Sequence, residues 1–171
     1  QVTHWSFTPT MLHRLLLHPE FGNYDLSSLR SGGGGGSTFS PALISSAKES
    51  LPQLRTTFGV GYGLTECTAL ATLNSGAELD LFPTAVGRPL PTVEIEIRDE
   101  SGLAVADGVE GDIHLRGPNI MLGYWNKPDE TAATILEGRW LRTGDVGRFE
   151  GGRLYLASRR HDLILRGGEN I

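Results

Sequence analysis

The periodicity of the apolar residues changes near residue 86, and this change most constrains the fold. Beyond it, Val93, Ile95 and Ile97 alternate with charged residues, and residues 112–116 alternate again. A period of two is typical of strands with one buried face. Glycine turns separate further short strands, predicted at 140–143, 146–149, 153–157 and 163–166, and a short helix is predicted to open at Pro128. This half predicts a small antiparallel β-barrel-like subdomain.

The preceding half predicts an α/β portion, in which a strand leads into a glycine-rich loop and helices. A strand is expected within residues 1–9, and a first helix capped by Thr10 ends before Pro19. A second helix has Ser40 as its N-cap and Pro41 at its first position. A short strand from 55 to 60 then runs directly into a glycine-rich loop. Open α/β sheets bind ligands where their strands end, so this loop is a candidate site.

Five consecutive glycines, 32–36, precede Ser37 and the second helix. Such a run is usually a flexible linker. A glycine turn that enters a helix can also form the wall of a ligand site, because backbone replaces side chain there. The sequence favours neither interpretation over the other.

The overall composition excludes several classes of protein. A net charge of −5 and the lack of a basic run argue against a nucleic-acid surface. No apolar stretch is long enough to predict a transmembrane segment. The single cysteine, Cys67, cannot form an internal disulfide, which fits a reducing compartment, and we predict a cytoplasmic location.

The loop after the third predicted strand reads Gly61-Tyr62-Gly63-Leu64-Thr65-Glu66. Glycines leave room for a ligand to approach the backbone. Tyr62 offers a flat face to a base or acyl group, Thr65 a hydroxyl to a phosphate, and Glu66 a hard oxygen to Mg²⁺. The alternative is an ordinary loop with Tyr62 in the core and Glu66 in water, and these six residues alone favour it.

Together with residues 142–145 (Arg-Thr-Gly-Asp) and the segment 159–171, this loop resembles the adenylate-forming superfamily, which includes acyl-CoA synthetases and peptide-synthetase adenylation domains. The resemblance covers nearly the whole chain and includes further motifs at 29–41, 86–89, 116–118 and 123–124. It implies a fold like that of an acyl-CoA synthetase. It also implies two steps: a carboxylate attacks the α-phosphate of Mg·ATP to give acyl-AMP and pyrophosphate, and a thiol then displaces AMP.

The resemblance assigns roles to individual residues. It implies that Tyr62, between Gly61 and Gly63, stacks on adenine and that Thr65 donates a hydrogen bond to the α-phosphate. Glu66 is implied to hold Mg²⁺, and Asp145 to accept hydrogen bonds from the ribose hydroxyls. The remaining implied members of the site are Arg159 at the ribose or phosphate, Gly35, Gly36 and Ser37 along the groove for adenine and the acyl chain, and His161 as the hinge pivot.

The chain also departs from the family pattern. Ser158 stands where the hinge usually has glycine, and Ser37-Thr38 replaces the usual Ala-Pro. The family's phosphate loop and its lid lysine are not in this sequence, so we expect a piece of a longer enzyme that is inactive by itself. The expected division is 1–84 as the end of an α/β subdomain, 85–158 as a β-rich subdomain, and 159–171 as a hinge segment to a C-terminal lid domain.

The resemblance favours an acyl-CoA synthetase that uses ATP, Mg²⁺ and CoA to activate a carboxylic acid, most simply a fatty acid. One alternative is an adenylation domain that loads a carrier protein. A second alternative, of another class, is a non-catalytic scaffold that binds nucleotide. The catalytic roles would fall to Thr65 and Glu66.

Overall fold

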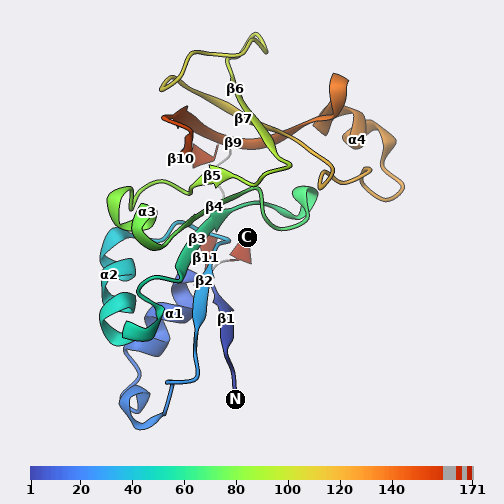
Figure 1. The fold of residues 1–171 in the computed structure, drawn as a ribbon. Coiled ribbons are helices and arrows are strands. Elements are labelled where there is room, and N and C mark those ends of the chain that lie inside the picture. Colours follow the sequence, from blue (N-terminus) through green and yellow to red (C-terminus); the bar gives the residue numbers. More distant parts are fainter. Residues whose placement is uncertain (160–164, 167–168, 171) are drawn as a thin grey trace. The chain divides into compact units, whose positions relative to one another are not determined.

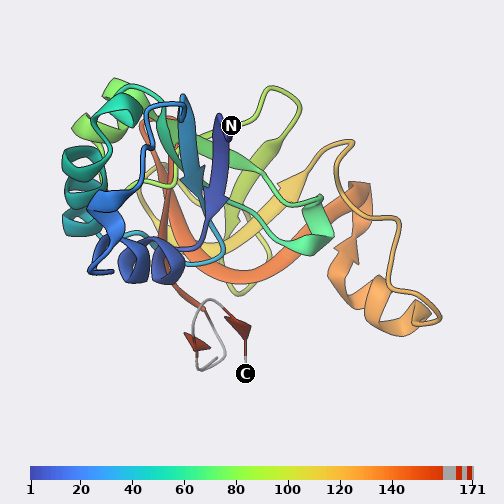
Figure 2. The ribbon, with the colours of Figure 1, turned by 90° about the horizontal axis from the view of Figure 1, so that it is seen from below.

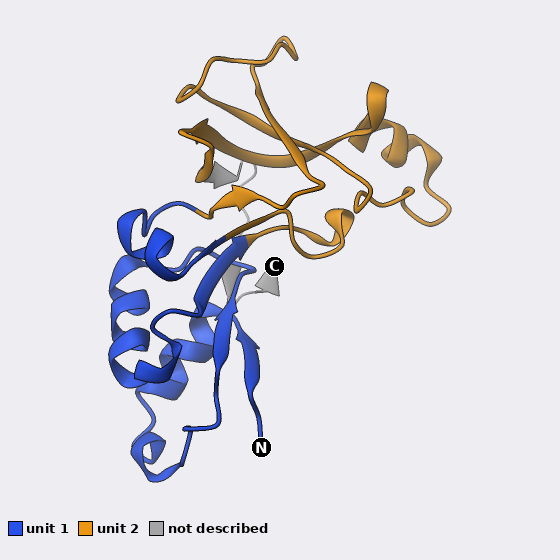
Figure 3. Ribbon diagram, viewed as in Figure 1, with its two compact units in different colours: residues 1–61, 74–85, 164–171 blue, residues 62–73, 86–163 orange. Residues whose placement is uncertain are grey.

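The computed structural model describes residues 1–159, 165–166 and 169–170, and for residue 158 onward it describes the backbone alone. The chain divides into two compact units, coloured separately in Figure 3. Unit 1 contains residues 1–61 and 74–85, together with residues from 164 to 171, and unit 2 contains residues 62–73 and 86–163. The expected division at residues 84/85 and 158/159 stays a prediction.

Unit 1 is built on parallel strands with helices along one face (Figures 1 and 2). Its strand pairs are β1 with β2 and β2 with β3, both parallel. Its elements are β1 (His4–Phe7), α1 (Pro9–Leu16), η1 (Phe21–Asn23), β2 (Ser31–Gly34), α2 (Pro41–Ser50), η2 (Pro52–Leu54), β3 (Phe58–Tyr62) and α3 (Gly76–Leu81), with β11 (Leu165–Arg166) and β12 (Glu169–Asn170) near the C-terminus. The predicted α/β portion is therefore confirmed. The strand predicted over residues 55–60 begins later, at Phe58, because residues 55–57 form a turn.

Helices α1 and α2 both begin at proline residues. Ser40 accepts a hydrogen bond from the backbone N–H of Leu43 and caps α2, as predicted. The prediction that Thr10 caps α1 is wrong. The Thr8 hydroxyl accepts a hydrogen bond from the N–H of Met11 and caps this helix, and Pro9 takes the first helical position. Proline fits there because its fixed φ suits a helix and its missing N–H would have no partner in the first turn.

The glycine run is a strand rather than a flexible linker. Its first three residues lie in β2, between β1 and β3. A Cβ added to Gly33 would lie 2.1 Å from the carbonyl oxygen of Gly59, and one added to Gly34 would lie 1.7 Å from that of Phe7. Side chains here would force the neighbouring strands apart, so the glycines set the spacing of the sheet.

The core of unit 1 joins its helices to its strands. Its largest fully buried side chains are Phe58, Leu12, Leu51, Leu54 and Leu79. At its edge, the Lys48 ammonium on α2 lies 2.6 Å from the Asp80 carboxylate on α3. The apolar face of α2 packs in the core, and its one lysine, Lys48, forms an ion pair within unit 1.

Unit 2 contains an antiparallel sheet with the strand order β10-β9-β7-β6. Its elements are η3 (Thr65–Cys67), β5 (Arg88–Pro89), β6 (Glu94–Arg98), β7 (Glu110–Arg116), α4 (Pro128–Thr134), β8 (Ile135–Leu136), η4 (Glu137–Arg139), β9 (Trp140–Glu150) and β10 (Arg153–Arg159). β4 (Thr72–Ser75) begins in unit 2, where it pairs antiparallel with β5. Figure 2 shows that β9 is strongly curved. This sheet confirms the predicted antiparallel, curled portion of the fold.

One element of this sheet was predicted incorrectly. The strands expected at 140–143 and 146–149 form one strand, β9, that continues through Gly144 and Asp145. The glycine has a φ of +78°, and the strand accommodates it by a bulge rather than by a turn. The core beneath includes Ile113, Leu115 and Leu141, which are fully buried.

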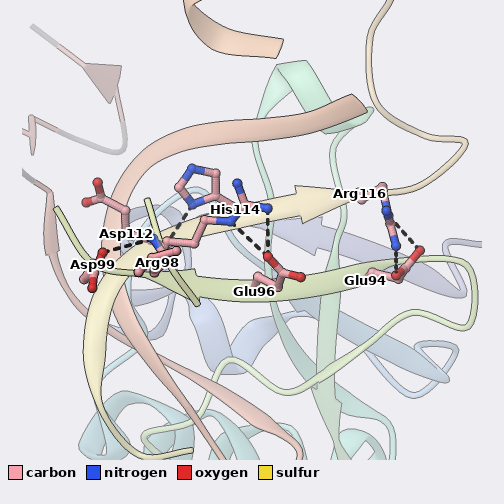
Figure 4. Close-up of polar contacts among 8 residues, drawn as sticks. Glu94, Glu96, Arg98, Asp99, Asp112, His114 and Arg116 are labelled. Atoms are coloured by element: carbon pink, nitrogen blue, oxygen red, sulfur yellow. Dashed lines mark hydrogen bonds and ion pairs between the residues drawn. The ribbon is translucent and has the colours of Figure 1, made fainter. Parts of the chain in front are cut away.

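The outer face of the sheet carries charged residues in pairs. Glu94 pairs with Arg116 and Glu96 with Arg98, along β6 and β7 (Figure 4). Both guanidinium groups also lie over the ring of Trp140, at 4.9 Å for Arg98 and 4.6 Å for Arg116. The arginines therefore cover a buried tryptophan while their charges are balanced. Among the described residues, no helix has the length and apolar character needed to cross a membrane.

Candidate functional site

The Gly61–Glu66 motif spans the end of β3 and the turn that follows. Tyr62 is the last residue of the strand, and Thr65 and Glu66 open the 3₁₀ helix η3. Gly63 lies between them, where a Cβ would be 2.1 Å from the carbonyl oxygen of Ala69. The backbone at Ala69 therefore folds back closely onto Gly63. The Thr65 hydroxyl and the Glu66 carboxylate follow in this turn, directly after Tyr62.

The rest of this loop is held by side chains. The Cys67 thiol donates to the carbonyl of Leu64, whose N–H in turn donates to the sulfur, both at 3.3 Å. The Asn119 amide donates to the carbonyl oxygens of Cys67 (2.9 Å) and Leu70 (3.4 Å). Thr68 and the residue after it have positive φ values, 55° and 76°, which non-glycine residues rarely adopt. These bonds stabilise a loop conformation that the backbone alone would disfavour.

Tyr62 and Asp145, 83 residues apart, are joined by a hydrogen bond. The phenol donates to Oδ2 of Asp145 at 2.7 Å, and both side chains are buried. Burial raises the pKa of Tyr62 above its ordinary value of 10.0, and the nearby Asp145 carboxylate raises it further. The phenol therefore remains a donor at neutral pH, and it fixes one oxygen of the carboxylate.

The bulge in β9 places Asp145. Asp112 of β7 pairs with Val146, and His114 pairs with Arg142, so three residues, 143–145, face the single residue Ile113. Within the bulge, the Thr143 hydroxyl donates to the carbonyl of Ile113 (2.9 Å) and accepts from the N–H of Asp145 (3.1 Å). The strand thus turns its aspartate toward Tyr62 without ending.

The Glu66 carboxylate has a partner from outside its own sequence motif. The Tyr124 phenol donates to Oε1 of Glu66 at 2.7 Å. The N–H of Met121 donates to the backbone oxygen of Glu66 at 2.8 Å. Burial raises the pKa of Tyr124, and the bond to Glu66 raises it further, so Tyr124 also remains a donor at neutral pH. Both ends of Glu66, side chain and backbone, are therefore bonded to the segment 121–124.

The other predicted residues differ in how the structure describes them. Thr65 is exposed. Gly35, Gly36 and Ser37 follow β2 in unit 1, and a Cβ on Gly35 would lie 2.7 Å from the oxygen of Gly61. Arg159 pairs through its backbone with Asp145, while its side chain and the predicted hinge residue His161 lie outside the described residues. The structure thus joins Tyr62 to Asp145 directly, and the predicted roles of all these residues, Tyr62 and Asp145 included, stay predictions.

Three residues that bond to the motif residues or to their loop were not identified from the sequence: Tyr124, Thr143 and Asn119. Tyr124 and Thr143 lie in sequence motifs, but their partners are 58 and 30 residues away along the chain. Asn119 follows the motif 116–118, and its side-chain amide donates to backbone carbonyl groups. Nothing in a single sequence identifies such partners, because the bonds exist only once distant segments of the chain have folded together.

Comparison with known proteins places this geometry in a family. The model of the AMP-binding enzyme family matches residues 1–125, which is most of the chain. The chain belongs to the AMP-binding enzyme family. A long-chain-fatty-acid–CoA ligase of Yersinia pestis is 37% identical over 163 residues, and the ligase of that name in Bacillus subtilis is 40% identical over 166 residues. Each comparison covers 95% of this chain but 28% and 29% of the relative, so the chain spans under a third of their length.

Solved structures agree with this assignment. The amide bond synthetase McbA of Marinactinospora thermotolerans superposes with a TM-score of 0.89 at 39% identity, over 99% of this chain and 34% of that one. The o-succinylbenzoate coenzyme A synthetase MenE of Bacillus subtilis, in complex with ATP and magnesium ion, gives 0.80 at 32% identity, over 99% and 34%. The fold of this AMP-binding family member is thus the fold of adenylate-forming enzymes, as the sequence predicted.

Proposed function

We propose that the protein carrying this chain uses ATP to convert a carboxylic acid, most simply a fatty acid, to an acyl-adenylate and then transfers the acyl group to CoA. The observation that carries the proposal is the 2.7 Å bond between Tyr62 and Asp145, in a chain of the AMP-binding enzyme family. It brings the tyrosine predicted to stack on adenine beside the carboxylate predicted to bind the ribose. The fatty-acid CoA ligases among its relatives support the acid and the acceptor.

The proposed roles follow from the chemistry of the side chains. A tyrosine ring offers a planar apolar face to adenine, and Asp145 offers carboxylate oxygen to ribose hydroxyls. Thr65, which is exposed after the turn, can donate a hydrogen bond to the α-phosphate. Arg159 would counter the phosphate charge. The reaction brings two anions together, so fixed donors and cations have their largest effect as charge develops in the transition state.

The residues present fit a magnesium ion carried in by ATP. Glu66 is half-buried, and its Oε1 is bonded to Tyr124, while no described residue donates to Oε2. Across the described part of the chain, no three His, Cys, Asp or Glu residues are grouped as a metal site. Mg²⁺ commonly takes one or two carboxylates together with substrate phosphates and water, which matches a single glutamate. When bound, Mg²⁺ would neutralise phosphate charge.

A second acceptor has a specific observation in its favour. The amide bond synthetase McbA is 39% identical, as similar as the CoA ligases, and covers almost the whole chain. An amine could therefore replace the CoA thiol in the second step, while the first step stays the same.

A pyrophosphate-release assay across acids of varied chain length tests the proposal in the full protein. We expect release from ATP only when a carboxylic acid is present, and acyl-CoA in the products when CoA is added. Product formation with an amine but not with CoA would favour the amide synthetase. If no acid stimulates release, the enzyme proposal fails and a nucleotide-binding scaffold gains support. Glu66→Ala should abolish release, and activity retained at ordinary Mg²⁺ concentrations would contradict the magnesium role.

A further inference from the structure

We propose that Tyr124 is a positioning residue that holds the Glu66 carboxylate in the orientation needed to bind the magnesium ion of Mg·ATP. This inference rests on the proposed function, because it assumes that Glu66 is the magnesium ligand. Its own basis is the hydrogen bond from the Tyr124 hydroxyl to Oε1 of Glu66, at 2.7 Å.

The bond engages one oxygen of the carboxylate and directs the other. In the part of the chain that the structure describes, Glu66 accepts one side-chain hydrogen bond, at Oε1. A glutamate side chain has several rotatable bonds, and a free one must lose that freedom when it coordinates a metal. A donor that fixes Oε1 leaves Oε2 in a defined direction. Hydrogen-bond partners of metal ligands commonly act in this way.

Tyr124 is itself held by the start of α4. Its N–H donates to the Thr131 hydroxyl at 2.9 Å, and that hydroxyl donates to the carbonyl of Lys127 at 2.7 Å. A Cβ on Gly123 would lie 2.6 Å from a methyl carbon of Thr131, so glycine is required beside this contact. The backbone that presents the phenol therefore has little freedom to move.

A second bond connects the same two segments. The N–H of Met121 donates to the backbone oxygen of Glu66 at 2.8 Å. The backbone of Glu66 is thus placed by Met121 and its carboxylate by Tyr124, three residues further along. Removing the phenol hydroxyl should leave the backbone bond intact and release the carboxylate alone. Tyr124→Phe keeps the ring and removes the hydroxyl that bonds to Glu66, together with its interaction with the Thr134 side chain.

The test measures metal binding as well as turnover in the full protein. Mn²⁺ serves as a paramagnetic probe for Mg²⁺, and its binding with a non-hydrolysable ATP analogue is measured by electron paramagnetic resonance. We expect Tyr124→Phe to weaken this binding by about 10- to 100-fold, the usual effect of removing such a partner. The Mg²⁺ concentration for half-maximal pyrophosphate release should rise in parallel. Tyr24→Phe, the same change at a side chain that is 65% exposed, should leave both unchanged.

A double-mutant cycle with Glu66→Gln separates positioning from a general structural effect. If Tyr124 acts through Glu66, Tyr124→Phe should add nothing to the loss of metal binding in Glu66→Gln. Unchanged Mn²⁺ binding in Tyr124→Phe, with binding lost in Glu66→Gln, would overturn this inference alone. Equal losses that add in the double variant would also overturn it. If the wild-type protein binds no metal–nucleotide complex, the proposed function fails first, and this inference fails with it.

Discussion

Replacing Tyr62 by phenylalanine removes the phenol that donates to Asp145 and keeps the aromatic ring. Asp145 is 5% exposed, so water cannot easily replace the lost donor. Hydrogen bonds to charged groups contribute about 1.5–3 kcal/mol each, and a buried acceptor that loses its donor is costly. Because Asp145 has other interactions, including one from its own N–H to Thr143, we expect a loss near the middle of this range. A loss of about 2 kcal/mol corresponds to a factor of roughly 30 in the folding equilibrium.

Urea unfolding of the full protein, followed by fluorescence, measures this loss. Tyr155→Phe is the matched control, since among the described residues the Tyr155 hydroxyl has no hydrogen bond and its ring lies 4.5 Å from the Arg148 guanidinium. The control should change the free energy of unfolding by less than about 0.5 kcal/mol, as for ordinary surface substitutions. Equal stability of Tyr62→Phe and the wild-type protein would refute the bond as a stabilising contact.

The pH dependence of the same difference gives an independent check. Burial raises the pKa of Tyr62 above its ordinary value of 10.0, so the folded state retains this proton more tightly than the unfolded state. The resulting stability is fully present below pH 10.0 and is lost as the pH rises beyond it. The advantage of wild type over Tyr62→Phe should therefore be constant from about pH 6 to 9 and shrink in stronger alkali. A difference that varies across the neutral range would contradict this assignment.

Three further predictions concern the scaffold around the site. Burial lowers the pKa of His114 below 6.5, and the charges of Arg98 and Arg142 lower it further, so the contribution of neutral His114 to stability is present above pH 6.5 and is lost on acidification. Between about pH 6.5 and 5, the melting temperature of His114→Gln should therefore fall less than that of the wild-type protein. An equal fall in both proteins would contradict this assignment. Gly33→Ala should lower the free energy of unfolding by about 3 kcal/mol, because its Cβ would lie 2.1 Å from the backbone oxygen of Gly59. In the same urea assay Gly22→Ala should be tolerated, because a Cβ there would have no atom within 4 Å. Asn119→Ala removes two hydrogen bonds to the loop after Tyr62 and should speed amide hydrogen exchange at residues 63–70. Exchange as slow as in the wild-type protein would show that the Asn119 bonds do not stabilise this loop.

Local chemistry made several elements predictable from the sequence. Ser40 and Pro41 begin α2 because the cap and the fixed φ act within one turn. The alternation around Ile97 predicted a half-buried strand, since one face of β6 packs in the core. The motif 61–66 was correctly predicted at the end of a strand, because the strand and the glycines that follow it are contiguous in sequence.

Other features depend on residues distant in the chain, and no local pattern encodes them. The glycine run has no periodicity, and it becomes a strand because β1 and β3 pack against it on both sides. Gly144 and Asp145 look like a turn, yet the backbone bonds of β7 and β10 carry β9 through them. The partners of Glu66 and Asp145 come from segments far away along the chain, and they become neighbours only when unit 2 has folded. The motif residues Tyr62, Glu66 and Asp145 were thus recognisable from the sequence, while the residues that bond to the loop and strand around them were not.

A crystal structure of the full protein with Mg²⁺ and a non-hydrolysable ATP analogue tests the central claim most directly. We expect the Tyr62 ring to lie against adenine, Asp145 to accept hydrogen bonds from the ribose hydroxyls, and Glu66 to coordinate the metal through Oε2 while Oε1 keeps its bond to Tyr124. A nucleotide bound away from Tyr62 and Asp145, or a metal with no contact to Glu66, would contradict it.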